Sequence, residues 1–169
     1  MPVLQLKTVI MLILLASAMA LGVAWFTQYG LGFAPCQLCL KQRWPYYLAI
    51  GFMLAAFVLN YSDRQLAARW LIAITGVFML TGAGIAVYHS GVEWKFWPGP
   101  TTCGKGAGFA GNIGDLMSQL KTARIVPCDE PPFRILGLSP AGYNVFYSLG
   151  LAWFCLWYAF MRPGEDHRR

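Results

Sequence analysis

Residues 9–29 read VIMLILLASAMALGVAWFTQY, an uncharged and mostly apolar stretch that decides the class of fold. Its length is about the 20 residues that a helix needs to cross the hydrocarbon core of a bilayer. Three further apolar stretches follow, over residues 44–59, 68–89 and 141–161. The sequence therefore predicts an all-α membrane protein built as a bundle of four transmembrane helices.

The composition agrees with a membrane location. Of the 169 residues, 57% are hydrophobic and 12% are charged, which is about half the charged fraction of a soluble domain. Four spans and one long connection use nearly the whole chain, so we predict a single membrane domain, 1–169. The net charge of +6 is scattered beside the apolar stretches instead of forming a stripe. This pattern indicates contact with the lipid bilayer and no nucleic-acid partner.

Two of the span boundaries are ambiguous in the sequence. The first stretch contains Ala16-Ser17-Ala18, which resembles a signal-peptide cleavage site, but its apolar run exceeds a signal core of about 7 to 15 residues. We therefore expect a retained helix. The second stretch is short unless residues 36–43 add a helical turn in front of it. Pro45 leaves both options open, because proline fits the first turn of a helix but kinks its interior.

Charge decides the orientation that we predict. Four spans place both termini on one side of the membrane and two loops, about residues 30–43 and 90–140, on the other. Lysine and arginine occur on both sides, but on the side of the termini they crowd into short segments at helix ends. The positive-inside rule applies to such segments. We therefore expect cytoplasmic termini and periplasmic loops.

The long connection carries a helical pattern of its own. Ile113, Leu116, Met117 and Leu120 recur at i, i+3, i+4 and i+7, which is the spacing of one helix face. We predict a short amphipathic helix here. Two locations stay open for it, the membrane interface and the surface of the bundle.

Four of the five cysteines fall on the loop side under this topology: Cys36, Cys39, Cys103 and Cys128. Cys155 lies in the middle of the fourth span, where a thiol acts as a small apolar group. A zinc site would need two close ligand pairs, and the sequence has one, so we predict no metal. Static disulfides remain an alternative, which suits Cys103 and Cys128 better than the other pair.

Cys36 and Cys39 form a C-x-x-C pair, a spacing typical of electron shuttling. If a helix begins near Cys36, the Cys39 thiolate lies at the positive end of the helix dipole. Arg43 follows four residues later, on the same face. Both effects favour the thiolate, which is the reactive form. The alternative for Arg43 is an interfacial cation whose head reaches water.

A dithiol that is oxidised repeatedly needs an electron acceptor, and no haem or dinucleotide fingerprint occurs in the sequence. A lipid-soluble quinone reaches the membrane surface by itself, so we predict the membrane quinone pool as the acceptor. His89 and Glu93, at the end of the third span, are candidates to hydrogen-bond or protonate its ring. A polar rim at the interface is the alternative role for both.

The segment PCQLCLKQR, residues 35–43, resembles the P-C-x-L-C-x-x-Q-R motif of the DsbB family. This family reoxidises the periplasmic thiol oxidase DsbA. Tyr88-His89 and the stretch PCDE, residues 127–130, leading to residues 136–138, are similar to later family segments in the same order.

The resemblance implies a quinone-dependent protein-disulfide oxidase in the inner membrane of a Gram-negative bacterium. It implies ubiquinone, or menaquinone, as the acceptor and a DsbA-like dithiol protein as the partner. The loop cysteines Cys103 and Cys128 would form the disulfide that the partner attacks at Cys103. Cys128 would then attack Cys36 and release Cys39 to engage the quinone, with Arg43 and His89 beside it.

Local charge favours the opposite point of attack. Asp129 and Glu130 flank Cys128, whereas Lys105 lies near Cys103, so Cys103 should be the better leaving group. The sequence therefore leaves the point of attack open. It also leaves one alternative from another class, a non-catalytic scaffold resembling tetraspanins, which would tolerate serine at Cys36 and Cys39.

Overall fold

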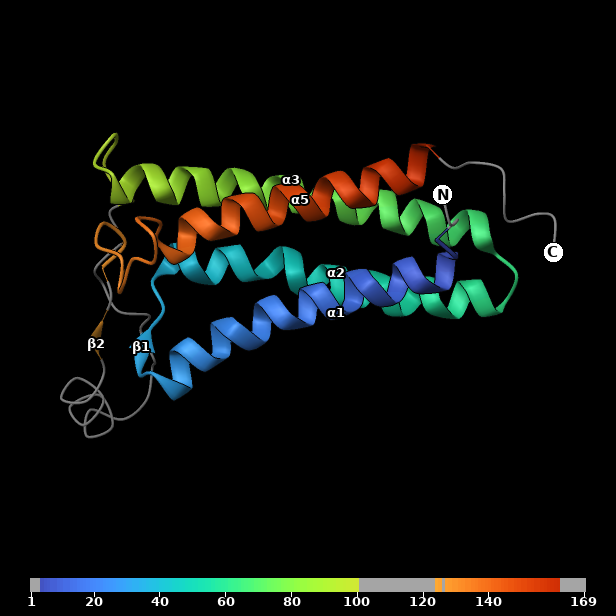
Figure 1. Ribbon diagram of the computed structural model, residues 1–169, viewed down its shortest axis with the longest axis horizontal. Coiled ribbons are helices and arrows are strands. Elements are labelled where there is room, and N and C mark those ends of the chain that lie inside the picture. The colour runs from blue at the N-terminus through green and yellow to red at the C-terminus, as the bar shows by residue number, and fades with distance from the viewer. Residues whose placement is uncertain (1–3, 101–123, 126, 162–169) are drawn as a thin grey trace.

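The computed structural model describes residues 4–100, 124–125 and 127–161. Figure 1 shows a bundle of four long helices, each long and apolar enough to cross a membrane. They are α1 (Leu6–Trp25), α2 (Gln37–Tyr61), α3 (Gln65–Glu93) and α5 (Pro140–Met161). The predicted all-α membrane fold is confirmed. The amphipathic helix predicted over residues 113–120 lies outside the described residues.

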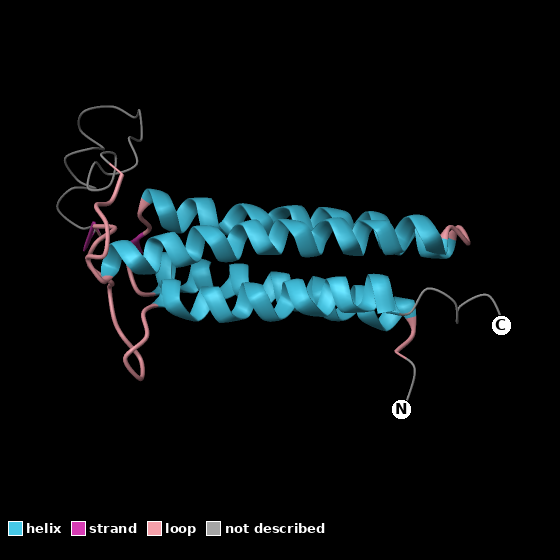
Figure 2. Ribbon diagram, turned by 90° about the horizontal axis from the view of Figure 1, so that it is seen from above, coloured by secondary structure: helices cyan, strands magenta, loops and turns pink. Residues whose placement is uncertain are grey.

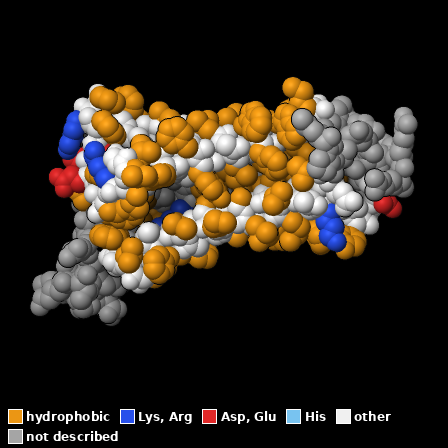
Figure 3. Space-filling view, viewed as in Figure 1, with side chains coloured by type: hydrophobic (Ala, Val, Ile, Leu, Met, Phe, Trp, Pro, Cys, Tyr) orange, Lys and Arg blue, Asp and Glu red, His pale blue; other side chains and the backbone are white. Residues whose placement is uncertain are grey.

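The four helices share an apolar core. The helix α3 packs most closely against α5 and α2, and α2 packs against α1. At one end of the bundle, Val9 and Ile13 of α1 are fully buried among Met53, Ile72 and Tyr158 of the other helices. Figure 3 shows hydrophobic side chains along the outer surface of the bundle as well. An apolar exterior is expected where lipid replaces water.

The structure decides between the two starts that the sequence left open for the second span. The helix α2 runs over 25 residues from Gln37, so residues before Trp44 extend it, and Pro45 lies in its interior. The neighbouring helix accommodates the proline, since a Cβ atom added to Gly82 of α3 would lie 3.0 Å from Pro45 Cγ. Glycine thus lets α3 approach the proline ring closely.

The helix α3 also extends beyond its prediction, from residue 89 to Glu93. Residues 90–93, which we assigned to the long loop, are therefore helical. This places Glu93 one turn after His89 on a continuous helix. Both side chains are buried.

The described parts of the two loops, which include Cys36 and Cys128, gather at one end of the bundle, opposite the start of α1 and the end of α5 (Figures 1 and 2). At the loop end, α1 is extended by a turn of π-helix, η1 (Phe26–Gly30). A short parallel pair joins β1 (Phe33–Ala34) to β2 (Arg124–Ile125). This pairing ties the connection between α1 and α2 to the long connection.

Candidate functional site

The C-x-x-C pair forms the N-terminus of α2. Cys36 is the N-cap residue, and its Sγ accepts a hydrogen bond from the Cys39 backbone N–H at 3.2 Å. A side-chain acceptor at this position satisfies one of the N–H groups that the first helical turn leaves free. Both residues are free thiols, and their Sγ atoms lie 2.8 Å apart.

The environment of Cys36 favours its thiolate. The hydrogen bond with Cys39 and the contact with His89, whose Nε2 lies 3.7 Å from the Cys36 Sγ, lower the pKa of Cys36 to about 4, although burial opposes this shift. Cys36 therefore carries negative charge at neutral pH. Cys39 lies in the first turn of α2, as expected for a helix that begins near Cys36, and the capping contact is made by Cys36.

His89 and Glu93 lie one turn apart on α3, and both are buried. The His89 Nε2 is 3.8 Å from Glu93 Oε1. Glu93 Oε2 has no hydrogen-bond partner among the described residues. The helix thus brings an imidazole and a buried carboxyl group to the cysteine pair.

Arg43 lies on the same helix as the cysteines, and its guanidinium reaches across to the end of α1. It donates from Nη1 to Gln28 Oε1 at 2.7 Å and from Nη2 to the Ala24 carbonyl at 3.2 Å. The side chain is buried. Gln28 belongs to η1, so the π-helical turn contributes to holding the cation in place. π-Helical turns occur frequently at functional sites.

A cavity of about 760 Å³ adjoins these residues. Cys36, Cys39, Arg43, His89 and Glu93 all lie on its wall, and most of the remaining lining comes from apolar side chains of α1 and α5 and of the segment 127–135. Figure 3 shows a hollow on this face of the bundle with basic side-chain atoms inside it. A cavity of this size and character accommodates an organic ligand.

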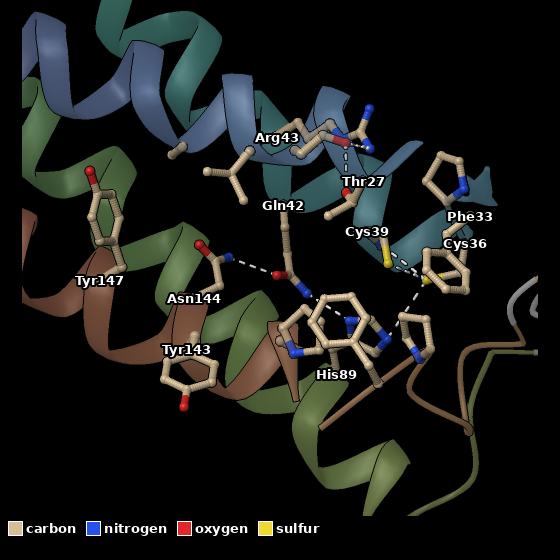
Figure 4. A pocket seen from close by; sticks show the side chains of 18 of the residues that line it. Thr27, Phe33, Cys36, Cys39, Gln42, Arg43, His89, Tyr143, Asn144 and Tyr147 are labelled. Atoms are coloured by element: carbon tan, nitrogen blue, oxygen red, sulfur yellow. Dashed lines mark hydrogen bonds between the residues drawn. The ribbon is translucent and has the colours of Figure 1, made fainter. Parts of the chain in front are cut away.

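Two polar residues that we had not singled out also line the cavity, Gln42 and Asn144. Figure 4 shows the Gln42 side chain between His89 and Asn144, with a hydrogen bond to each. Each residue gave a signal in the sequence. Gln42 is part of the motif that follows Cys39, and Asn144 is an uncharged polar residue inside an apolar span, where such groups need partners.

The sulfur atoms of Cys36 and Cys39 and a ring nitrogen of His89 all lie within 4.8 Å of one another. Such a group has the donor types of a zinc site. However, a metal-binding histidine normally donates from its second ring nitrogen, and here that atom, Nδ1, faces the amide nitrogen of Gln42 at 2.8 Å. The neighbour of Nδ1 is thus an amide nitrogen and not the oxygen acceptor that a zinc-bound histidine uses.

Of the second predicted cysteine pair, Cys103 and Cys128, the structure describes Cys128. Cys128 is disulfide-bonded and fully buried, and it packs in one apolar cluster with Cys36, Leu38 and Val92. Cys103, the predicted partner, lies outside the described residues. The structure thus brings a disulfide sulfur from the long loop against the C-x-x-C pair.

An ion pair changes the charge argument at Cys128. Lys95 donates to Asp129 at 2.8 Å, and this contact holds the pKa of Asp129 below its usual value. The lysine charge compensates the carboxylate beside Cys128. The reason for which we expected Cys128 to be the poorer leaving group is therefore weaker than the sequence indicated.

Comparison with known proteins points to one family. The model of the family "Disulfide bond formation protein DsbB" matches residues 6–158. The chain is 25% identical over 160 residues to disulfide bond formation protein B of Stutzerimonas stutzeri, covering 89% of this chain and 93% of the relative. It is 29% identical over 153 residues to the protein of the same name from Xanthomonas axonopodis pv. citri, covering 86% of each.

An uncharacterized protein of Rickettsia prowazekii is 27% identical over 150 residues, which is 88% of this chain and 84% of that protein. No solved structure matches the chain. The resemblance inferred from residues 35–43 is confirmed over most of the chain.

Proposed function

Because the chain belongs to the family of disulfide bond formation protein DsbB, we propose that it is a protein-disulfide oxidase with a DsbA-like partner and a quinone acceptor. Family membership and the four spanning helices make it a disulfide bond formation protein of a membrane. One observation carries the finer proposal. Cys36 shares a buried apolar cluster with the disulfide-bonded Cys128, and both Cys36 and Cys39 line a large apolar cavity.

The first half of the proposed reaction moves two electrons from the partner to the C-x-x-C pair. A partner thiolate attacks Cys103 and forms a mixed disulfide, which frees Cys128. Cys128 attacks Cys36 of the oxidised pair and frees Cys39. The packing of Cys128 against Cys36 in one apolar cluster supports this step.

The loop pair is then restored. The second thiol of the partner releases Cys103, and the partner leaves as a disulfide. Cys103 attacks Cys128, re-forms the loop disulfide and returns Cys36 as a thiolate. The balance is a partner dithiol oxidised and the Cys36–Cys39 disulfide reduced to two thiols. Stabilisation of the Cys36 thiolate makes Cys36 a good leaving group in the last exchange.

The cavity fits a quinone in size and in chemistry. Its walls are mostly apolar, and Arg43 and His89 supply hydrogen-bond donors at the end that contains the sulfur atoms. These two side chains would hold the ring oxygens, and Glu93, with its unpartnered Oε2, would exchange protons with His89. A bound quinone would accept two electrons and two protons from the Cys36–Cys39 dithiol, which returns the pair to its disulfide.

The proposed location is the inner membrane of a Gram-negative bacterium, with periplasmic cysteine loops and cytoplasmic termini. The described parts of the two loops lie at the same end of the bundle, and this supports one common side of the membrane for them (Figure 1). A periplasmic loop end gives a DsbA-like partner direct access to the long loop.

Turnover with purified components tests the proposal. We expect the protein in lipid nanodiscs to oxidise a reduced DsbA-like protein only when ubiquinone or menaquinone is supplied. Cys39→Ser should abolish turnover, whereas Cys155→Ser, which changes a buried thiol in the core of the bundle, should retain it. Equal turnover with and without quinone, or full activity of Cys39→Ser, would contradict the proposed function.

A further inference from the structure

A continuous chain of hydrogen bonds runs from the interior of the bundle to the reactive sulfur. The Tyr46 hydroxyl donates to Asn144 Oδ1, and Asn144 Nδ2 donates to Gln42 Oε1 at 2.7 Å. Gln42 Nε2 lies 2.8 Å from His89 Nδ1, and His89 Nε2 lies 3.7 Å from Cys36 Sγ. Three helices, α2, α3 and α5, contribute to this chain (Figure 4).

The two hydrogen bonds from Tyr46 to Asn144 and from Asn144 to Gln42 point the same way along this chain. A primary amide has one acceptor end and one donor end, so the orientation of each amide fixes that of the next. Tyr46 occupies the oxygen of Asn144, which directs the Asn144 nitrogen to the oxygen of Gln42. The Gln42 nitrogen then faces His89 Nδ1, which must act as the acceptor.

A neutral imidazole carries its proton on one nitrogen only. With Nδ1 acting as an acceptor, the proton is on Nε2, the atom that faces Cys36 and Glu93. We propose that Gln42 and Asn144 are positioning residues that hold the His89 ring as an Nε2–H donor aimed at the Cys36 sulfur. This inference deepens the proposed function, and the catalytic role of the positioned ring rests on that function.

The burial of the chain couples the orientations of its members. Tyr46, Gln42 and His89 are buried, and Ser148, which is fully buried, lies 2.8 Å from the Tyr46 hydroxyl. Turning one amide alone would set two donors or two acceptors against each other in an environment without water. Such buried mismatches are costly. The amides therefore keep their orientation together or reverse it together.

Other charged groups near the sulfur do not replace this role. Besides Cys36, the titratable groups on the same cavity wall are Cys39, Arg43 and Tyr46 from α2, His89 and Glu93 from α3, Tyr143 and Tyr147 from α5, and Glu130 from the loop. The Arg43 guanidinium hydrogen-bonds to Gln28 and Ala24 of α1. His89 thus supplies the ring donor at Cys36, and its tautomer decides whether it can donate.

The tautomer itself is the most direct readout. The chain has one other histidine, His167, so nitrogen NMR of the reduced protein with His167→Gln reports His89 alone. We expect Nε2 to carry the proton and Nδ1 to be bare. In Gln42→Glu, studied at a pH at which the new carboxyl group is ionised and can only accept, Nδ1 should become protonated. A protonated Nδ1 in the wild type, or a bare Nδ1 in Gln42→Glu, overturns the proposal.

The part played by Asn144 is tested through Cys36. With Cys103→Ala and Cys128→Ala to remove the loop thiols, the pH dependence of Cys36 alkylation is followed by mass spectrometry of the reduced protein. Asn144→Leu should raise the midpoint by about half a pH unit, or about threefold in thiolate stability, the effect of one hydrogen bond in a membrane protein. Asn60→Leu is the matched control: it makes the same substitution at the far end of α2, and it should leave the midpoint unchanged.

A double-mutant cycle separates positioning from general damage to the structure. In a His89→Ala background, Asn144→Leu should cause no further shift of the midpoint, because its effect passes through the ring. The same shift with and without His89 would refute the positioning role. The NMR and alkylation experiments use neither quinone nor the partner protein. If the proposed electron transfer were wrong, their results would be unchanged, so the two failures can be told apart.

Discussion

Cys36 combines a structural and a chemical role at a single position. As the N-cap of α2 it accepts the Cys39 N–H, and it also contacts the Cys39 thiol and the His89 ring. These contacts stabilise negative charge on its sulfur. Cys36 lies just outside the membrane-spanning helix α2. The same sulfur atom therefore caps the helix and is the candidate for thiol chemistry.

The pH dependence of Cys36 reactivity follows from these contacts. Its pKa is lowered from 9.0 to about 4, so the thiolate is present at all pH values above about 4 and is lost as the pH falls through that value. Alkylation of the reduced protein should therefore reach its maximal rate by about pH 6. His89→Ala should move the midpoint upward, whereas Cys155→Ser should not. A wild-type midpoint near 9.0 would show that the cap does not stabilise the thiolate.

At the scale of elements, α2 determines the site. Its first two turns carry the cysteine pair, Gln42 and Arg43, and its middle carries Pro45. The proline packs against Gly82 of α3. The helix therefore stays continuous from the cysteines to the far side of the bundle and fixes the site relative to α3.

Substitution of Gly82 tests this contact. A Cβ atom at Gly82 would meet the Pro45 ring at 3.0 Å, so Gly82→Leu should destabilise the bundle by about 1–3 kcal/mol through overpacking. Gly84→Leu provides the matched control, since nothing lies within 4 Å of a Cβ atom there. Thermal unfolding in detergent measures both variants. Equal stability of the two would mean that α2 and α3 do not approach each other at Pro45.

The sequence predicted most of the elements but left the start of α2 open, for a physical reason. Lys41, Gln42 and Arg43 interrupt the apolar run in front of Trp44, so hydropathy ends there. In the structure, Gln42 and Arg43 are buried because α1, α3 and α5 supply their hydrogen-bond partners. These partners are distant in the sequence, and no local pattern reveals them.

At the scale of the whole molecule, the arrangement of the helices creates the site. His89 lies 53 positions after Cys36 in the chain, and Asn144 lies 102 positions after Gln42. The motif identified the cysteines and Arg43, and residue type made His89 and Glu93 candidates. The cavity and the hydrogen-bond chain result from the packing of four helices and could not be predicted from the sequence.

The orientation in the membrane is a prediction for the whole molecule. Cytoplasmic termini follow from the basic residues at the helix ends on that side. A green fluorescent protein fused after Arg169 should therefore fluoresce, and an alkaline phosphatase fused after Pro98 should be active in the periplasm. The opposite pair of results would place the cysteine loops in the cytoplasm and exclude a periplasmic partner.

The central claim is that Cys36 and Cys39 are a working redox couple that passes electrons to an acceptor in the adjoining cavity. A single turnover tests this most directly. The protein is reduced in nanodiscs, quinone is added, and acid-quenched samples are analysed for the Cys36–Cys39 disulfide and for quinol. We predict that one disulfide forms for each quinol produced. Quinol formation while Cys36 and Cys39 remain thiols, or a pair that stays reduced in the presence of quinone, would contradict the account.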